Sequence, residues 1–428
     1  MRVTWDAGIL SESCLKAYAT RNINMNALSE TNSAVHESPG RLFLRFLRFG
    51  LLAWGGPVAQ IAMIRHELVE EEKWISKERF NRVLAVYQAL PGPEAHELCV
   101  YFGTLRGGRL GGLAAGLGFM LPGFLLMLLL SWVYLTVGIT SPLFLAAFYG
   151  MQPAVVALIV RGAQRIGQHA LSDRWLWGIA AIACVLQFLG VNFVLILLAA
   201  GLFYTAVRRF GLQTTTTIGI LLLIAILTFH FGIDRVTATT DAATATLATK
   251  PPPLAILGVG LRTGLLTFGG AYSAISFLRH DAVTVGGWLS DGQFLDGIAL
   301  GGILPAPLII FGTFVGYLSG GFLGALLLTV GIFAPAFGFS LIGHEWIERM
   351  VDTPWLHSFF DGVTAAVVGL IVATTLSLLP TAITDIPTAL ICLLTLAIVT
   401  RWKSKASTPL AVLLGALLGW LIHYFGLN

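Results

Sequence analysis

The chain has 428 residues, of which 56% are hydrophobic and only 11% are charged, and its net charge at pH 7 is +4. Soluble globular proteins carry about 25% charged residues, so this composition excludes an ordinary soluble protein. The small positive charge is also unlike the strongly basic surface of a nucleic-acid-binding protein, and we expect no nucleic-acid partner.

The chain begins with a polar, irregular stretch, residues 1–41, that we expect to be a cytoplasmic segment. It lacks the short apolar core and small-residue cleavage site of a signal peptide, so we expect none to be removed. Four scattered cysteines form no CxxC pair: Cys14, Cys99, Cys184 and Cys392. The sequence therefore predicts no disulfide framework, no metal site and no cofactor.

Long apolar runs fill the remainder, and about 20 such residues suffice to cross a bilayer as a helix. No Asp, Glu, Lys or Arg occurs in residues 175–207, 297–343 or 406–428. The runs are continuously apolar and do not alternate, which favours helices over a β-barrel. We predict an all-α membrane protein with thirteen spans. They lie near residues 42–64, 80–104, 110–136, 143–168, 174–190, 192–207, 212–232, 256–278, 294–318, 322–343, 358–379, 386–400 and 408–426.

The two halves of the chain are copies of one unit. Residues 48–93 and 262–307 align without a gap, and 17 of the 46 positions are identical. Weaker similarity continues toward the end of each half. The sequence therefore predicts two repeats, residues 42–209 and 254–428. Residues 210–253 supply a single connecting span and a polar linker.

The loop charges indicate how the repeats are oriented, because Lys and Arg favour cytoplasmic loops. Basic loops in one repeat match uncharged or acidic loops in the other. The basic members are Arg106 and Arg109, then Arg161, Arg165 and Arg174 flanking one turn, and in the second repeat Arg401, Lys403 and Lys405. This pattern predicts inverted topology, with a cytoplasmic amino terminus and an extracytoplasmic carboxyl terminus. Two parallel copies are the alternative.

Each repeat opens with one span interrupted by glycines and a second interrupted by prolines, and neither residue type favours a helix interior. Non-helical backbone at membrane depth survives only where it is buried in protein or lines a wet cavity. The free N–H groups of the following half-helices suit an anion. We therefore predict a substrate site at Gly55, Gly56, Pro57, Pro91, Gly92, Pro93, Gly269, Gly270, Pro305 and Pro307. Simple kinks that serve helix packing are the alternative.

Charged side chains inside the predicted spans extend this site. Arg48 and Arg262 each precede a Gly-Gly break by seven residues, and a guanidinium suits a tetrahedral oxyanion. We predict that both bind substrate, although they could instead extend to a membrane surface. Glu94, His96 and Glu97 follow the first proline break, and their counterparts are apolar. They predict proton coupling or gating, with a solvated helix end as the alternative.

These motifs resemble the chromate ion transporter family in its long, two-domain form, over nearly the whole chain from about residue 42. The similarity lies in FGLLAWGGPVAQ (49–60), ALPGPEAHELCVYFG (89–103), TGLLTFGGAYSAI (263–275) and GGILPAPLIIFGTFVGY (301–317). The resemblance implies chromate export across a bacterial inner membrane, driven by a proton gradient or the membrane potential. Sulfate has the same charge and shape. Ala271 and Ala306 depart from the family pattern and make the two halves unequal.

The leading hypothesis is a secondary active exporter of chromate or another oxyanion that works by alternating access between the repeats. The chain has no GxxxxGK[ST] motif and so no nucleotide-driven engine of its own. An anion channel or an importer of the same fold is the alternative. An intramembrane enzyme is a remote one, because neither HExxH nor GxSxG occurs and no catalytic residue is predicted. The residues leave a homodimer open.

Overall fold

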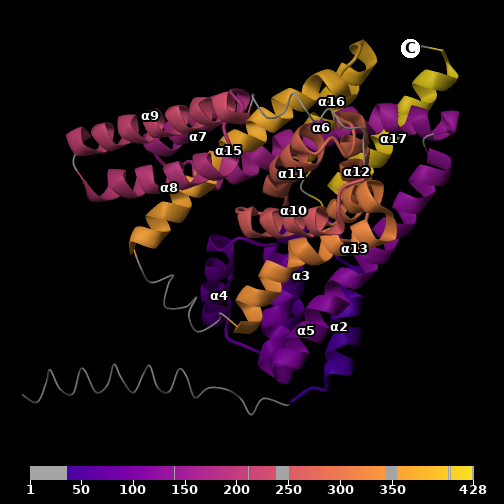
Figure 1. Cartoon of the computed structure of the whole chain (residues 1–428). Coiled ribbons are helices and arrows are strands. Elements are labelled where there is room, and N and C mark those ends of the chain that lie inside the picture. The colour runs from indigo at the N-terminus through magenta and orange to yellow at the C-terminus, as the bar shows by residue number, and fades with distance from the viewer. Residues whose placement is uncertain are drawn as a thin grey trace, which may run out of the picture.

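The computed structural model describes residues 36–138, 140–210, 212–237, 250–342, 354–402, 404 and 406–426. This part of the chain is helical and contains no β-strand, which confirms the predicted all-α class (Figure 1). Residues 1–35 of the amino-terminal segment, residues 238–249 of the linker, and Lys403 and Lys405 lie outside the described residues.

Helices begin and end close to the predicted spans, and each of the four predicted breaks separates two helices. The first repeat comprises α2 (Pro39–Leu51), α3 (Gly56–Ile64), the π-helix η1 (Arg65–Glu71), α4 (Lys77–Ala89), α5 (Glu94–Val133), the π-helix η2 (Tyr134–Gly138), α6 (Pro142–Ala170), α7 (Arg174–Phe188) and α8 (Phe193–Arg209). The connecting helix is α9 (Leu212–Thr237).

The second repeat follows the same order. It comprises α10 (Pro253–Leu266), α11 (Ala271–Arg279), the π-helix η4 (His280–Val285), α12 (Asp291–Gly302), the 3₁₀ turn η5 (Leu308–Ile310), α13 (Phe311–Ile342), α15 (Pro354–Ala382), α16 (Ile386–Arg401) and α17 (Ser407–Tyr424).

The longest helical segment of each repeat, α5 or α13, consists of two helices that fold back on each other as a hairpin. Gly103 lies against Gly111 and Ala115, whereas a straight helix would hold Gly103 and Ala115 ~18 Å apart. The chain reverses at Gly107 and Gly108, whose dihedral angles (φ −138°, ψ 17° and φ 61°, ψ −161°) are not helical. The same reversal occurs in α13 at residues 320 and 321, with φ −145°, ψ 20° and φ 64°, ψ −151°.

Within the described residues, five helical segments are long and apolar enough to cross a membrane. They are Glu94–Gly138, Pro142–Ala170, Leu308–Ile342, Trp355–Ala382 and Ser407–Tyr424. Shorter apolar helices are Arg174–Phe188, Gln213–Ala225, Pro253–Leu266 and Ile386–Arg401. These segments indicate a membrane protein, and two of the five are hairpins. Thirteen crossings stay a prediction.

Matching glycines pack the first helix of each repeat against its hairpin. Gly50 of α2 lies against the backbone of Phe119 in α5, and Gly264 of α10 lies against the backbone of Ile332 in α13. Small residues let helix backbones approach closely in membranes. The sequence identity between the repeats is therefore matched by identical local packing.

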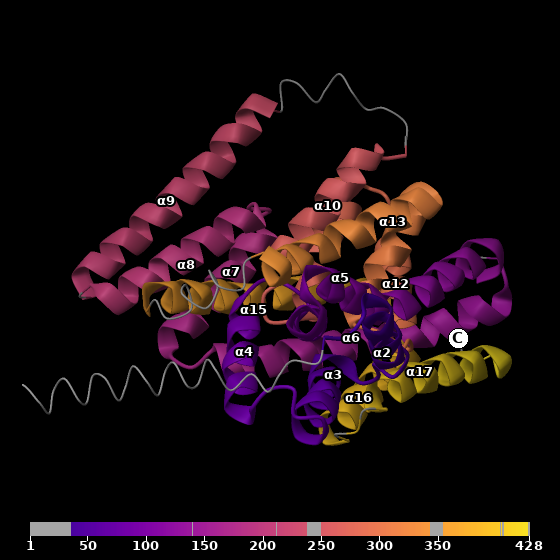
Figure 2. The same ribbon diagram turned by 90° about the horizontal axis from the view of Figure 1, so that it is seen from below.

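Helices of each repeat pack against helices of the other repeat. Helix α6 of the first repeat packs on α16 and α17 of the second, and α15 of the second packs on α7 and α8 of the first. In both views α7, α8 and α9 lie together on one side of the molecule and α17 lies on the other (Figures 1 and 2). The larger buried cluster accordingly draws its side chains from both repeats.

The equivalent helices α6 and α15 contact each other and run in opposite directions. Gly292 lies beside Gln152 of α6 and Thr381 of α15, whereas Gly269 lies beside Ile166 and Thr364. Residue numbers thus rise along α6 while they fall along α15. The hairpins behave in the same way, because residues 112 and 116 of α5 meet residues 341 and 337 of α13.

Candidate functional site

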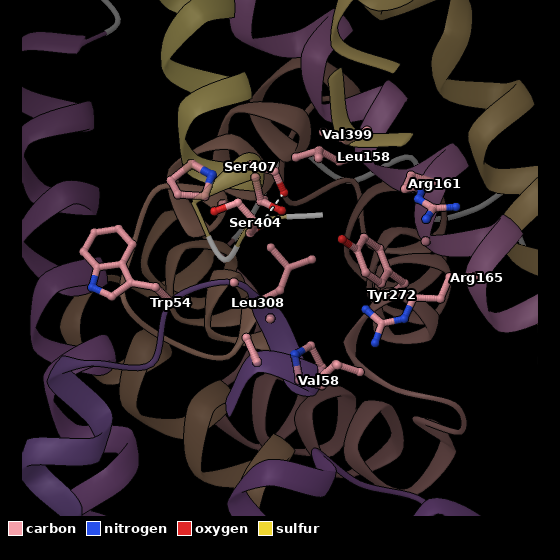
Figure 3. A pocket seen from close by; sticks show the side chains of 18 of the residues that line it. Trp54, Val58, Leu158, Arg161, Arg165, Tyr272, Leu308, Val399, Ser404 and Ser407 are labelled. Carbon is pink, nitrogen blue, oxygen red and sulfur yellow. Dashed lines mark hydrogen bonds between the residues drawn. The ribbon is translucent and has the colours of Figure 1, made fainter. Parts of the chain in front are cut away.

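A cavity of about 480 Å³ lies where the helix breaks of the two repeats meet (Figure 3). The first break contributes Trp54, Gly55, Gly56 and Pro57. Tyr272 is the second residue of α11, just beyond the second repeat's glycine break, and Ala306 lies within its proline break. The remaining break joins the same region, because the Gly92 amide donates a hydrogen bond to the Thr267 carbonyl at 2.8 Å.

The glycine breaks owe their shape to backbone angles that other residues adopt only with strain. Gly55 and Gly56 have φ values of 87° and 77°, and Gly269 and Gly270 have values of 72° and 102°. Glycine reaches this region without a steric penalty. The interruptions therefore follow from the local sequence, and helices α3 and α11 restart immediately beyond them.

Helix amino termini surround the cavity. Helices α3, α11 and α17 all begin among residues that line it or adjoin it, and none of the three has a side chain capping its first N–H groups. An uncapped helix start carries partial positive charge and leaves hydrogen-bond donors unsatisfied. These ends favour a negatively charged occupant.

Two arginines of α6, Arg161 and Arg165, add full positive charge to the cavity. They lie four residues apart and therefore on one face of the helix. The Arg161 guanidinium donates to the Gln164 amide oxygen at 2.9 Å. Among the described residues, no carboxylate lies within 4.0 Å of either guanidinium. Their charge is therefore left available to a ligand.

Tyr272 and Glu94 complete the electrostatic surroundings. The Tyr272 phenol lies within electrostatic reach of both arginines, and the Glu94 carboxylate interacts with Arg165. Figure 3 shows Tyr272, Arg161 and Arg165 on one side of the cavity and Trp54 on the other. The Ser407 hydroxyl donates to the Ser404 carbonyl at 2.8 Å, and both serines line the cavity. The arrangement suits a small anion that accepts hydrogen bonds.

The structure places only part of the predicted substrate site on the cavity wall. Gly55, Gly56 and Pro57 line it. The other predicted break residues lie in the breaks around it but outside the lining: Pro91, Gly92, Pro93, Gly269, Gly270, Pro305 and Pro307.

Arg48 and Arg262 do not line the cavity, because each is held by a carboxylate of the π-helix in its own repeat. The Arg48 Nη2 atom lies 2.5 Å from Glu67 Oε2, and the Arg262 Nε atom lies 2.7 Å from Asp281 Oδ2. The two ion pairs occupy equivalent positions. They join the first helix of each repeat to the turn that follows its glycine break.

The three residues predicted for proton coupling lie at different distances from the cavity. Glu94 is half-buried beside Arg165. His96 is fully buried, with its ring 4.9 Å and 4.7 Å from the ring centroids of Phe333 and Phe337. Glu97 is also fully buried, and its carboxylate lies so close to Gly92 that a Cβ there would sit 2.5 Å from Oε1.

The sequence does not single out Arg161, Arg165 and Tyr272 as site residues. The loop charges place the two arginines at a turn, although both fall inside the predicted span 143–168. Two arginines one helical turn apart in an apolar span are a usable signal, since charge there is costly. Tyr272 carries no such signal, because only the folded chain brings it against Gly162 of α6.

The fold and the cavity define a class: a helical membrane protein of two related halves that enclose a positively charged cavity. The chain belongs to the chromate transporter family, whose sequence profile matches residues 40–205 and 254–420.

Several relatives extend over most of the chain. A chromate transport protein of Pseudomonas aeruginosa is 50% identical over 390 residues, covering 89% of this chain and 92% of the relative. A chromate transport protein of Cupriavidus metallidurans is 32% identical, covering 91% of this chain and 96% of the relative. A probable chromate transport protein of Synechococcus elongatus is 30% identical, covering 92% and 98%. No solved structure matches the chain.

Proposed function

We propose that the protein is a secondary active transporter that exports chromate, or a related oxyanion such as sulfate, from the cytoplasm across a bacterial inner membrane. The observation that carries this proposal is the cavity at the meeting point of the helix breaks. It combines uncapped helix starts with two arginines that have no carboxylate within 4.0 Å among the described residues. The names of the relatives favour chromate as the cargo.

A tetrahedral dianion in this cavity would accept hydrogen bonds from Arg161 and Arg165. Arginine offers parallel N–H donors that match two oxygens of such an anion, and these charge-assisted bonds are the stronger kind. The Tyr272 hydroxyl and the first N–H groups of α3 and α11 supply further donors. In this proposal Arg48 and Arg262 have a structural role in place of the predicted substrate contact.

Alternating access follows from inverted repeats. The antiparallel course of α6 and α15 supports that topology, because two membrane-crossing helices related in this way have opposite orientations. The amino terminus then lies in the cytoplasm and the carboxyl terminus outside it. A proton gradient or the membrane potential drives transport. Glu94, beside Arg165, is a coupling group in this scheme, together with the buried His96 and Glu97.

Labelled chromate uptake into oriented proteoliposomes, with sulfate as competitor, tests the proposal. Replacement of Arg165 or Arg161 by Gln should lower kcat/KM by roughly 10- to 100-fold, since a hydrogen bond to a charged group contributes about 1.5–3 kcal/mol. Arg174→Gln is the matched control, because Arg174 starts α7 against Trp175 and does not line the cavity. Wild-type transport by both cavity variants, or an equal loss in the control, would contradict the assignment.

The same vesicles separate a transporter from a channel and an exporter from an importer. An imposed pH or voltage gradient should drive chromate above its equilibrium distribution in a coupled transporter. A channel of the same fold would only equilibrate it. The orientation of the vesicles then gives the direction of transport.

A further inference from the structure

A buried carboxylate lies apart from the arginine cavity and has no part in the function proposed above. Asp296 of α12 is only 6% exposed. The Tyr134 hydroxyl donates to its Oδ2 atom at 2.8 Å, and the Gln152 amide nitrogen donates to its Oδ1 atom at 2.9 Å. The Tyr134 ring is itself fixed between Phe148 and Phe314, with centroid distances of 5.3 Å and 4.9 Å.

Within the part of the chain that the structure describes, no cationic side chain pairs with this carboxylate. Among the described residues the titratable group that faces Asp296 is the Tyr134 phenol, and α6 contributes the neutral Gln152. No charged side chain of α5, α13, α15 or α17 interacts with it electrostatically. On α12 itself the other carboxylate, Asp291, is paired with Arg279 at 2.7 Å. A buried charge without a cation is costly, and taking up a proton removes that cost.

The carboxylate ties the two repeats together. Its helix belongs to the second repeat, whereas Tyr134 and Gln152 belong to η2 and α6 of the first. Helices α6 and α12 also reach the cavity, since α6 carries Arg161 and α12 ends in Gly301 and Gly302. Nine residues of α6 separate Gln152 from Arg161, which is roughly 13.5 Å along the helix.

The first repeat has no carboxylate at the equivalent position. The aligned position in the first repeat is Arg82, which is exposed. Ionisable groups inside membrane proteins mark ion or proton paths by default. We propose that Asp296 binds and releases a proton that is coupled to anion transport, at a second site distinct from the anion cavity and from the Glu94 group. This inference rests on the proposed transport function.

The step requires only a proton from water. The charged carboxylate accepts both hydrogen bonds and holds α12 to η2 and α6. Protonation turns one oxygen into a hydroxyl group, which is a poorer acceptor, so the tie between the repeats weakens. Deprotonation restores it and returns the proton to water. The proton thereby weakens the contact between α12 of the second repeat and η2 and α6 of the first. Alternating access requires the two repeats to move at this contact.

Infrared difference spectra of the full chain in liposomes, recorded against pH without chromate, test this site directly. On acidification the wild type should gain a carboxylic-acid C=O band that Asp296→Asn lacks, and subtracting the variant's spectra from the wild type's isolates this band from those of the other carboxylates. Tyr134→Phe removes a donor to the charged form and should move the appearance of the band to higher pH. The inference is overturned if the band survives in Asp296→Asn or does not move in Tyr134→Phe.

Transport supplies the second readout. Asp296→Asn should lose chromate accumulation driven by a pH gradient, and the matched control Asp291→Asn, on the same helix, should keep it. Wild-type accumulation by Asp296→Asn would also overturn the inference. Normal transport by the Arg161 and Arg165 variants would instead contradict the assignment of the anion site. The infrared titration would still show whether Asp296 binds a proton.

Discussion

Arg48 and Arg262 have the same place in their repeats but different degrees of burial. The Arg48 side chain is 62% exposed and its partner Glu67 is 17% exposed. The Arg262 side chain is 40% exposed, whereas its partner Asp281 is only 1% exposed. Arg262 also lies 5.2 Å from the ring centroid of Phe193. Removal of the guanidinium therefore leaves a deeply buried carboxylate in one repeat and a partly solvated one in the other.

We expect Arg262→Ala to destabilise the protein by about 1–3 kcal/mol, the cost of a buried group left without its partner. Arg48→Ala should cost less than about 1 kcal/mol, as an exposed ion pair does. Thermal unfolding of the full chain in detergent measures both. Asp281→Asn added to Arg262→Ala should recover part of the loss, and equal losses at the two arginines would refute this reading.

The sequence predicts the role of a single residue when that residue acts on its own stretch of backbone. The glycine and proline breaks could be predicted because they act on their own backbone. The partners of Arg48 and Arg262 could not, because nothing in the sequence links Glu67 or Asp281 to an arginine 19 positions earlier. Tyr272 likewise becomes a site residue only through contact with a helix more than a hundred positions away in the chain.

At the scale of elements, the hairpins depend on glycines whose backbone angles are almost closed to other residues. Gly321 has φ 64° and ψ −151°, a region in which a side chain costs about 1–3 kcal/mol. We expect Gly321→Ala to lower the stability by that amount. Gly338→Ala, in the same helix, should be neutral or slightly stabilising, because an added Cβ there meets no atom within 4 Å.

Thermal unfolding again provides the measurement, with Gly108→Ala as the equivalent change in the first repeat. An unchanged melting temperature for both turn variants would mean that the hairpins do not require glycine. The predicted spans 80–104 and 110–136 placed a loop at residues 106–109, and the chain does reverse there. The sequence did not reveal that the reversal takes place at just two residues, Gly107 and Gly108.

At the scale of the whole molecule, the relative orientation of the repeats is open to a direct test. Single cysteines placed in the turns at residues 106–109 and 319–321, in a chain whose native cysteines are replaced, should react with an impermeant thiol reagent from opposite sides of the membrane. Inverted topology requires that result. Labelling of both turns from the same side would establish parallel copies.

The existence of two repeats could be predicted, because identity at a fixed offset is visible in the residues. Their mutual arrangement could not. An internal alignment says which segments are equivalent but not whether a helix packs within its own copy or on the other one. The contacts of Gly150 with Gly415 and Gly419, and of Gly369 with Ala180, join different repeats. Neither pair stands out in the sequence.

The packing of α6 and α15 on helices of the other repeat has a consequence for a single repeat on its own. A lone half would present to lipid the glycine-bearing face that its partner's terminal helices now cover. A single unit would thus need a second molecule of itself to cover that face, and joining two units in one chain supplies that cover.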